Sequence, residues 1–187
     1  MDPVTIANEA TLIYDNITKN SNAVVTRILS LYDLTATKEA LLDSYTPGQT
    51  ITYITRVENT GSASLYNLTI VDDLANGTLQ YIDTSIEGYL NGSPIEVDVQ
   101  KTANTVTFKI DNVLNPNDNV LIIFETTTPT TNPEQITNTQ TITANGGSTT
   151  GPIVAVTPNP SASVKLANYV SLDILKVTVF AVFCTST

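Results

Sequence analysis

Apolar and polar residues alternate with a period of two along most of this 187-residue chain. Within residues 51–58, for example, Ile51, Tyr53 and Val57 fall on one face of an extended chain. This alternation is typical of half-buried β-strands, whereas the 3.6-residue period of helices is scarce. Only residues 37–43 have a pattern that favours a helical turn. The sequence therefore predicts an all-β fold.

Turn signals rich in Asn, Gly and Pro separate the alternating runs, as at residues 47–48, 59–61, 91–92 and 145–147. Many short strands between such turns indicate an immunoglobulin-like antiparallel β-sandwich. The expected strands lie at residues 4–14, 22–37, 51–58, 68–72, 78–83, 94–100, 105–110, 119–127, 135–144, 152–157 and 163–183.

Composition excludes several classes of function. The chain has no histidine, one cysteine, 8 basic and 18 acidic residues, and a formal net charge of −10. Without histidine there is no Ser-His-Asp relay and no imidazole metal site, and one cysteine forms no internal disulfide. Strong acidity argues against nucleic-acid binding, which needs clustered positive charge. We therefore expect no enzymatic activity, no cofactor and no metal.

No apolar run approaches the roughly 20 residues of a membrane span, and the first residues lack the basic start and apolar stretch of a secretory signal. We expect no membrane span, and the sequence shows no conventional route to a surface.

Several runs in the central part of the chain resemble one known family. The runs are LTATK at 34–38, PGQTITY at 47–53, VENTG at 57–61, LTIVDDL at 68–74 and ITNT at 136–139. In this order they resemble the bacterial surface-repeat domain of unknown function "DUF eleven", which occurs in Gram-positive cell-wall and spore-surface proteins. The resemblance covers about two thirds of the chain and implies an immunoglobulin-like sandwich with structural or adhesive work.

The flanking segments continue the repeat frame. Residues 4–12 are similar to residues 134–142, and residues 171–176 are similar to residues 33–38. We therefore predict an N-terminal arm (1–29) that resembles the last strand of a repeat, a complete repeat (30–145), and a C-terminal extension (146–187) that resembles a further first strand. Unpaired strands of this kind tend to pair with other chains. The candidate intersubunit contacts are Ile6, Asn8, Ala10, Leu12 and Lys176.

Three polar residues fall on the core-facing side of their strands: Lys38, Asp72 and Asn138. A Lys in the first strand, an Asn in the last and an acid between them is the arrangement that Gram-positive pilin and adhesin sandwiches use for an autocatalytic isopeptide bond. Burial lowers the pKa of the lysine and raises that of the acid, which prepares a nucleophile and a proton carrier. The alternative is structural: Lys38 reaches solvent, Asp72 caps a turn and Asn138 bonds to backbone.

Cys184 is either a small apolar strand residue or an intermolecular disulfide partner. The favoured function is a structural subunit that assembles head to tail into a cell-surface or spore-surface fibre by β-strand augmentation. Its partners are then further copies of the chain and, in addition, other surface-repeat proteins. The alternative is a monomeric adhesin or stalk module from a multi-repeat surface protein.

Overall fold

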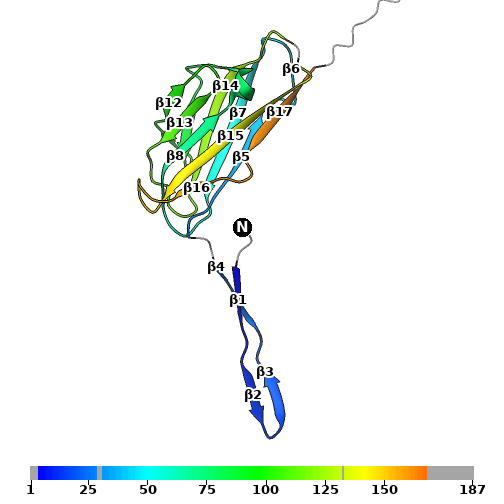
Figure 1. Cartoon of the computed structure of the whole chain (residues 1–187), viewed down its shortest axis with the longest axis vertical. Helices are drawn as coiled ribbons and strands as arrows, with labels where there is room; N and C mark the ends of the chain where they lie inside the picture. The colour runs from blue at the N-terminus through cyan, green and yellow to red at the C-terminus, as the bar shows by residue number, and fades with distance from the viewer. Residues whose placement is uncertain (1–3, 29–30, 132, 168–187) are drawn as a thin grey trace, which may run out of the picture.

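The computed structural model describes residues 4–28, 31–131 and 133–167. These residues form a β-sandwich and four N-terminal strands, paired as one long hairpin, that extend away from it (Figure 1). Within these ranges, no helix is long and apolar enough to cross a membrane. The predicted all-β sandwich is confirmed.

The first sheet of the sandwich has six strands. Its path is β11 (Ser93–Ile95), β10 (Glu87–Leu90), β14 (Asn119–Thr127), β7 (Thr50–Asn59) and β5 (Leu34–Ala40), and β9 (Gln80–Tyr81) pairs with β14. All of these pairs are antiparallel. Strand β5 follows the N-terminal strands in the chain and lies at the edge of this sheet.

The second sheet has seven strands. Its path is β12 (Asp98–Lys101), β13 (Val106–Ile110), β8 (Leu65–Asp72), β15 (Gln135–Gly146), β17 (Ser161–Leu166) and β6 (Ser44–Tyr45), and β16 (Ile153–Ala155) pairs with β15. Strands β16 and β17 lie beyond the boundary expected at residue 145. They belong to the sheet because the long strand β15 offers them backbone groups along its outer edge.

The core lies between the two sheets, and the alternation of the sequence fills it. Ile51, Tyr53 and Val57 of β7 are fully buried, as the period-two pattern predicts. The ring of Phe124 from β14 stacks on Tyr53 at 5.6 Å between centroids and lies 5.1 Å from the ring of Phe108 from β13. These rings join the sheets, because β7 and β14 belong to one and β13 to the other.

The helical turn predicted for residues 37–43 is wrong. Strand β5 continues to Ala40 because Glu39 and Ala40 pair with Ile54 and Tyr53 of β7. The helical turn lies instead at α1 (Leu74–Gly77), directly after β8. Its residues have positive φ angles between 49° and 78°, so it is a left-handed turn. Sequence periodicity does not reveal a single turn of this kind.

The N-terminal strands form one long hairpin over residues 4–28, called here the N-terminal hairpin. Strand β1 (Val4–Asn8) pairs with β4 (Val24–Ile28), and β2 (Thr11–Tyr14) pairs with β3 (Ile17–Asn20). Asp15 and Asn16 form the tip with φ of 48° and 61°, as a tight two-residue hairpin turn requires. The segment expected as one strand at 4–14 is therefore two strands, each paired within the hairpin.

Candidate functional site

The three core-facing polar residues meet at one point between the sheets. Lys38 comes from β5 of the first sheet, while Asp72 ends β8 and Asn138 lies in β15 of the second sheet. Strands β8 and β15 pair so that Gln140 lies opposite Asp72. Asn138 lies two residues before Gln140 in β15, so its side chain points to the same face of the sheet. The structure thus brings all three predicted residues together.

One carboxylate oxygen is the centre of this cluster. Oδ2 of Asp72 accepts hydrogen bonds from Nζ of Lys38 at 2.6 Å, from Nδ2 of Asn138 at 3.3 Å and from Nε2 of Gln140 at 3.0 Å. The side chains of Lys38 and Asp72 have no exposed surface. Because the Lys38 amine is enclosed, the alternative in which it reaches solvent is wrong.

The left-handed turn α1 holds the other oxygens of the cluster. The backbone N–H of Leu74 donates to Oδ1 of Asp72 at 2.9 Å. The N–H of Ala75 donates to Oδ1 of Asn138 at 3.3 Å and to Oδ1 of Asp73 at 2.9 Å. Asp72 therefore does receive a turn N–H, and Asn138 does bond to backbone, but Asp72 also pairs with the lysine and Asn138 also bonds to Asp72.

Aromatic rings form the apolar wall beside the lysine. Nζ of Lys38 lies 4.9 Å from the ring centroid of Tyr53 and 5.7 Å from that of Phe124. Burial lowers the pKa of Lys38 below its usual value, and the Asp72 carboxylate opposes this shift. Burial also raises the pKa of Tyr53, aided by the charge of Asp72 and opposed by the nearby Asn138 amide. A lowered pKa eases formation of the neutral amine, which is the nucleophilic form.

Sequence reasoning missed two members of the cluster. Gln140 bonds to Asp72, and its Oε1 accepts a hydrogen bond from Oγ1 of Thr55 at 2.9 Å. Both residues are fully buried. The signal was present, because Gln140 shares the core-facing side with Asn138, and Thr55 lies between Tyr53 and Val57 on the inward face of β7.

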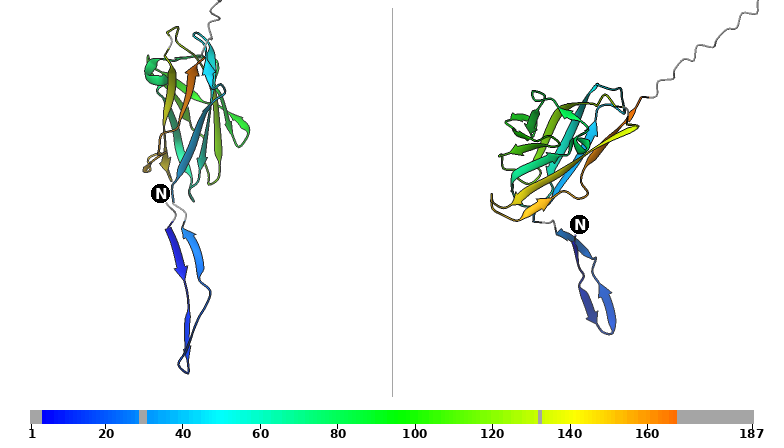
Figure 2. Two further views of the ribbon diagram at one scale, coloured as in Figure 1. Left: turned by 90° about the vertical axis from the view of Figure 1, so that its right-hand side faces the viewer. Right: turned by 45° about the horizontal axis from the view of Figure 1, so that its top comes forward.

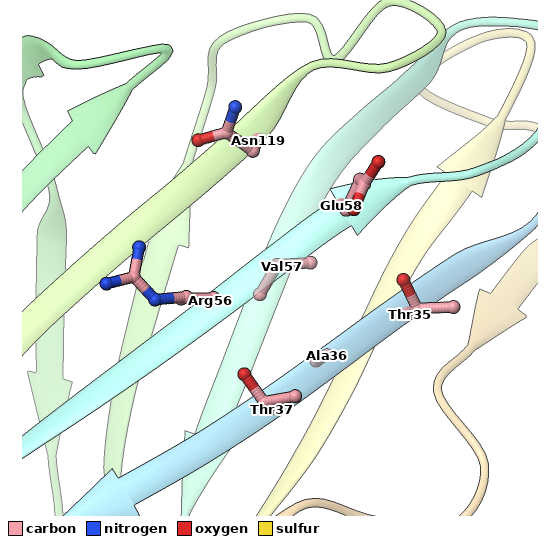
Figure 3. A pocket seen from close by; sticks show the side chains of 7 residues that line it. All are labelled: Thr35, Ala36, Thr37, Arg56, Val57, Glu58 and Asn119. Atoms are coloured by element: carbon pink, nitrogen blue, oxygen red, sulfur yellow. The ribbon is translucent and has the colours of Figure 1, made fainter.

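A shallow pocket lies on the opposite, outer face of β5 and β7, and Figure 3 shows Thr35, Thr37, Arg56 and Glu58 around it. These side chains alternate with the inward residues of the same strands, so they are separated from the Lys38 cluster by the sheet. Among the residues that the structure describes, no group of three or more His, Cys, Asp or Glu could hold a metal ion.

The candidate intersubunit residues lie apart from this cluster. Ile6, Asn8, Ala10 and Leu12 belong to the N-terminal hairpin, where Asn8, Ala10 and Leu12 are exposed. Lys176 and Cys184 lie outside the described residues.

Comparison with solved structures places this geometry among known folds. The structure matches BcpA, the major pilin subunit of Bacillus cereus, in its D312A form, with a TM-score of 0.55 at 12% identity over 86% of this chain and 47% of that chain. It matches the full-length major pilin SpaD of Corynebacterium diphtheriae with a TM-score of 0.53 at 14% identity, over 70% of this chain and 34% of that one.

The fold is similar to that of Gram-positive pilins. A collagen-binding domain from a Staphylococcus aureus adhesin also matches, with a TM-score of 0.46 at 14% identity over 74% of this chain and 97% of that chain. This chain spans about half the length of BcpA and a third of SpaD. At such low identity the likeness concerns the fold alone.

No family model matches the chain, and no curated protein matches its sequence. The resemblance to the surface-repeat domain therefore rests on the sequence runs given above.

Proposed function

We propose that the protein is a structural subunit of a surface fibre, whose sandwich is closed by an isopeptide bond between Lys38 and Asn138. The observation that carries the proposal is that Lys38 and Asn138, enclosed between the two sheets, both bond to the same carboxylate oxygen of Asp72. A buried charge is costly unless it is paired, and conversion of the amine and the carboxamide into a neutral amide removes the charge of the lysine.

The reaction needs only groups present in the cluster. Asp72 accepts a proton from the Lys38 ammonium, and the neutral Nζ attacks Cγ of Asn138. The N–H of Ala75 stabilises the negative charge that develops on Oδ1. A second proton passes from Nζ to Nδ2 through Asp72, the Cγ–Nδ2 bond breaks, and ammonia leaves. The product is one new Nζ–Cγ bond.

The position of the bond suits a protein that is pulled at its ends. Lys38 lies in the first strand after the N-terminal hairpin, and Asn138 pairs with Ala162 of β17, the last strand of the described chain. The bond would therefore link the first strand of the sandwich covalently to β15, the strand that pairs with its last strand. Such a covalent link serves a structural role rather than an enzymatic one. A fibre of this kind would act at an extracellular surface.

Intact-mass measurement of the purified protein tests the bond. We expect the wild type to be lighter than its sequence mass by one ammonia, and Lys38→Ala and Asn138→Ala variants to have their full masses. Asp72→Ala, which keeps both bonding partners, should also have its full mass. A wild type at its full sequence mass would exclude the bond.

Electron microscopy of concentrated protein tests the fibre. We expect filaments from the wild type and folded monomers after removal of residues 1–28, because the side chains of residues 7–25 are all exposed and are not part of the core. Isolated rods from the full chain would instead support the monomeric adhesin or stalk module.

A further inference from the structure

The N-terminal hairpin has exposed apolar side chains along its length. Every residue from Ala7 to Val25 is exposed. An isolated two-stranded ribbon is at best marginally stable in water, and gathered exposed apolar residues mark a surface that binds a partner. The large apolar residues, with 56–76% of their surface exposed, are Leu12, Ile13, Tyr14, Ile17, Val24 and Val25.

Strand β2 has the better edge for pairing with another strand. Its sequence, TLIY, contains no charge and three of the large exposed residues, whereas β3 carries Lys19. A lysine on an edge strand discourages pairing with other chains. The two-residue tip makes Tyr14 and Ile17 a hydrogen-bonded pair, so the backbone N–H and C=O of Ile13 point away from β3.

The sandwich has a matching open edge at β5. Among the residues that the structure describes, this seven-residue strand pairs with β7 alone. The N–H of Leu41, just after the strand, bonds to the carbonyl of Thr52 at 3.0 Å. Alternation along an antiparallel pair then turns the N–H and C=O groups of Ala36 and Lys38 away from β7.

The surroundings of the β5 edge are hollowed along part of its length. A hollow lies between β5 and the segment Val156–Ser161, in which Pro158 and Pro160 carry no N–H. The ends of β5 are apolar, because Leu31 is 59%, Leu41 61% and Leu42 37% exposed. A strand with apolar side chains that entered here would gain backbone hydrogen bonds and cover these leucines.

We propose that the β2 edge of one copy's N-terminal hairpin pairs with the β5 edge of a second copy. The inference rests on the proposed fibre function and names its contact. We assign the pairing partner to a second copy because the donor edge on β2 and the acceptor edge on β5 both belong to this chain. The hairpin lies outside its own sandwich in both views of Figure 2, so both edges are exposed in the same molecule. The accepting strand also carries Lys38, so the isopeptide bond would anchor the joint to β15.

Two proline variants test the contact from its two sides. Ile13→Pro removes an outward N–H of the donor, and Ala36→Pro removes an outward N–H of the acceptor, while neither residue's N–H takes part in pairing within the subunit. Each variant alone should be folded and form no filaments. Mixed together they should form heterodimers and nothing longer, because Ala36→Pro still donates and Ile13→Pro still accepts. Native mass spectrometry measures the oligomeric state of each variant alone and of the mixture.

The matched controls, Ile13→Ser and Ala36→Ser, keep their N–H groups and should assemble. Filaments from either proline variant, or no heterodimer from two folded variants, would overturn the inference. A wild type that forms no filament would overturn the proposed function as well, so the two failures are distinguishable.

Photocross-linking locates the contact without depending on those variants. A benzoylphenylalanine at position 13, in filaments mixed from isotopically labelled and unlabelled copies, should link to residues 31–42 of the other copy. The matched probe at position 18, which faces position 13 across the hairpin, should link there far less. Links within one copy, or links to β11 or β12 of a neighbour, would overturn the assignment.

Discussion

Lys38 and Asp72 form an ion pair with no exposed side-chain surface. Removal of one partner from such a pair leaves an unpaired buried charge, whereas replacement of both partners with neutral groups is tolerated. The stability of the sandwich without the proposed bond therefore depends on the pair as a unit.

A double-mutant cycle measures this dependence in an Asn138→Ala background, in which no isopeptide bond forms. Asp72→Asn should lower the free energy of unfolding by about 3–5 kcal/mol because Lys38 loses its counter-charge. Adding Lys38→Met should restore most of that loss. Denaturant unfolding gives the values. A loss within about 0.5 kcal/mol for Asp72→Asn, the range of ordinary surface changes, would contradict a charged buried pair.

Two buried tyrosines differ in what their hydroxyls do. The hydroxyl of Tyr45 donates to the carbonyl of Pro133, while that of Tyr53 lies buried with no well-aligned partner. Tyr45→Phe should therefore cost about 1 kcal/mol of unfolding free energy, and Tyr53→Phe should cost less than that or nothing. Thermal and denaturant unfolding of the two variants, compared side by side, measure the difference. The reverse order would show that the Tyr53 hydroxyl is hydrogen-bonded in solution.

The period-two alternation of the sequence predicted that Lys38, Asp72 and Asn138 face the core, because successive side chains of a strand point to opposite faces of the sheet. It did not reveal the contacts that Leu74 and Ala75 make through their backbone N–H groups. Those contacts depend on a left-handed turn of non-glycine residues, whose conformation follows from the surrounding structure.

At the scale of elements, pairing between strands determined the secondary structure and the partner strands that local sequence patterns did not specify. Residues 37–40 favour a helical turn in isolation but extend β5 because β7 offers them a partner strand. The N-terminal segment resembles a last repeat strand, yet it pairs with residues 17–28 because a turn at Asp15 and Asn16 is close by in sequence. Local sequence does not show which of two available partners a strand will take.

The turn between β7 and β8 holds the chain where the hairpin joins the sandwich. The N–H groups of Ser62 and Ala63 donate to the carbonyl of Leu31 at 3.2 and 3.0 Å. A Cβ on Gly61 would lie 2.7 Å from the backbone N of Asp33 and 2.8 Å from the carbonyl O of Leu31. The absence of a side chain at Gly61 therefore permits this close approach.

Gly61→Ala should consequently lower the free energy of unfolding by about 1–3 kcal/mol, since backbone must move to admit the methyl group. Gly88→Ala is the matched comparison, because its added Cβ would meet the end of the Val97 side chain, 2.5 Å away. A side-chain end shifts more easily than backbone, so Gly88→Ala should cost less. Equal losses would show that the Leu31–Asp33 backbone is free to adjust.

At the scale of the whole molecule, the proposed isopeptide bond would determine how tension crosses the sandwich. A pull between residues 31 and 167 enters through β5 and leaves through β17, and the bond joins β5 to β15 beside β17. With that bond formed, tension would pass through Lys38 and Asn138. The intervening residues 39–137, which build most of both sheets, would carry none of it.

Single-molecule stretching tests this property directly. With the bond formed, residues 39–137 cannot extend, so the length gained on full unfolding should be shorter by roughly 340 Å at about 3.4 Å per residue. Asn138→Ala, which lacks the bond but keeps the fold, should recover the missing length. An unchanged extension in the variant would mean that the wild type unfolds through the same residues. Asp72→Ala should match Asn138→Ala in length, because the proton transfer that forms the bond depends on that carboxylate.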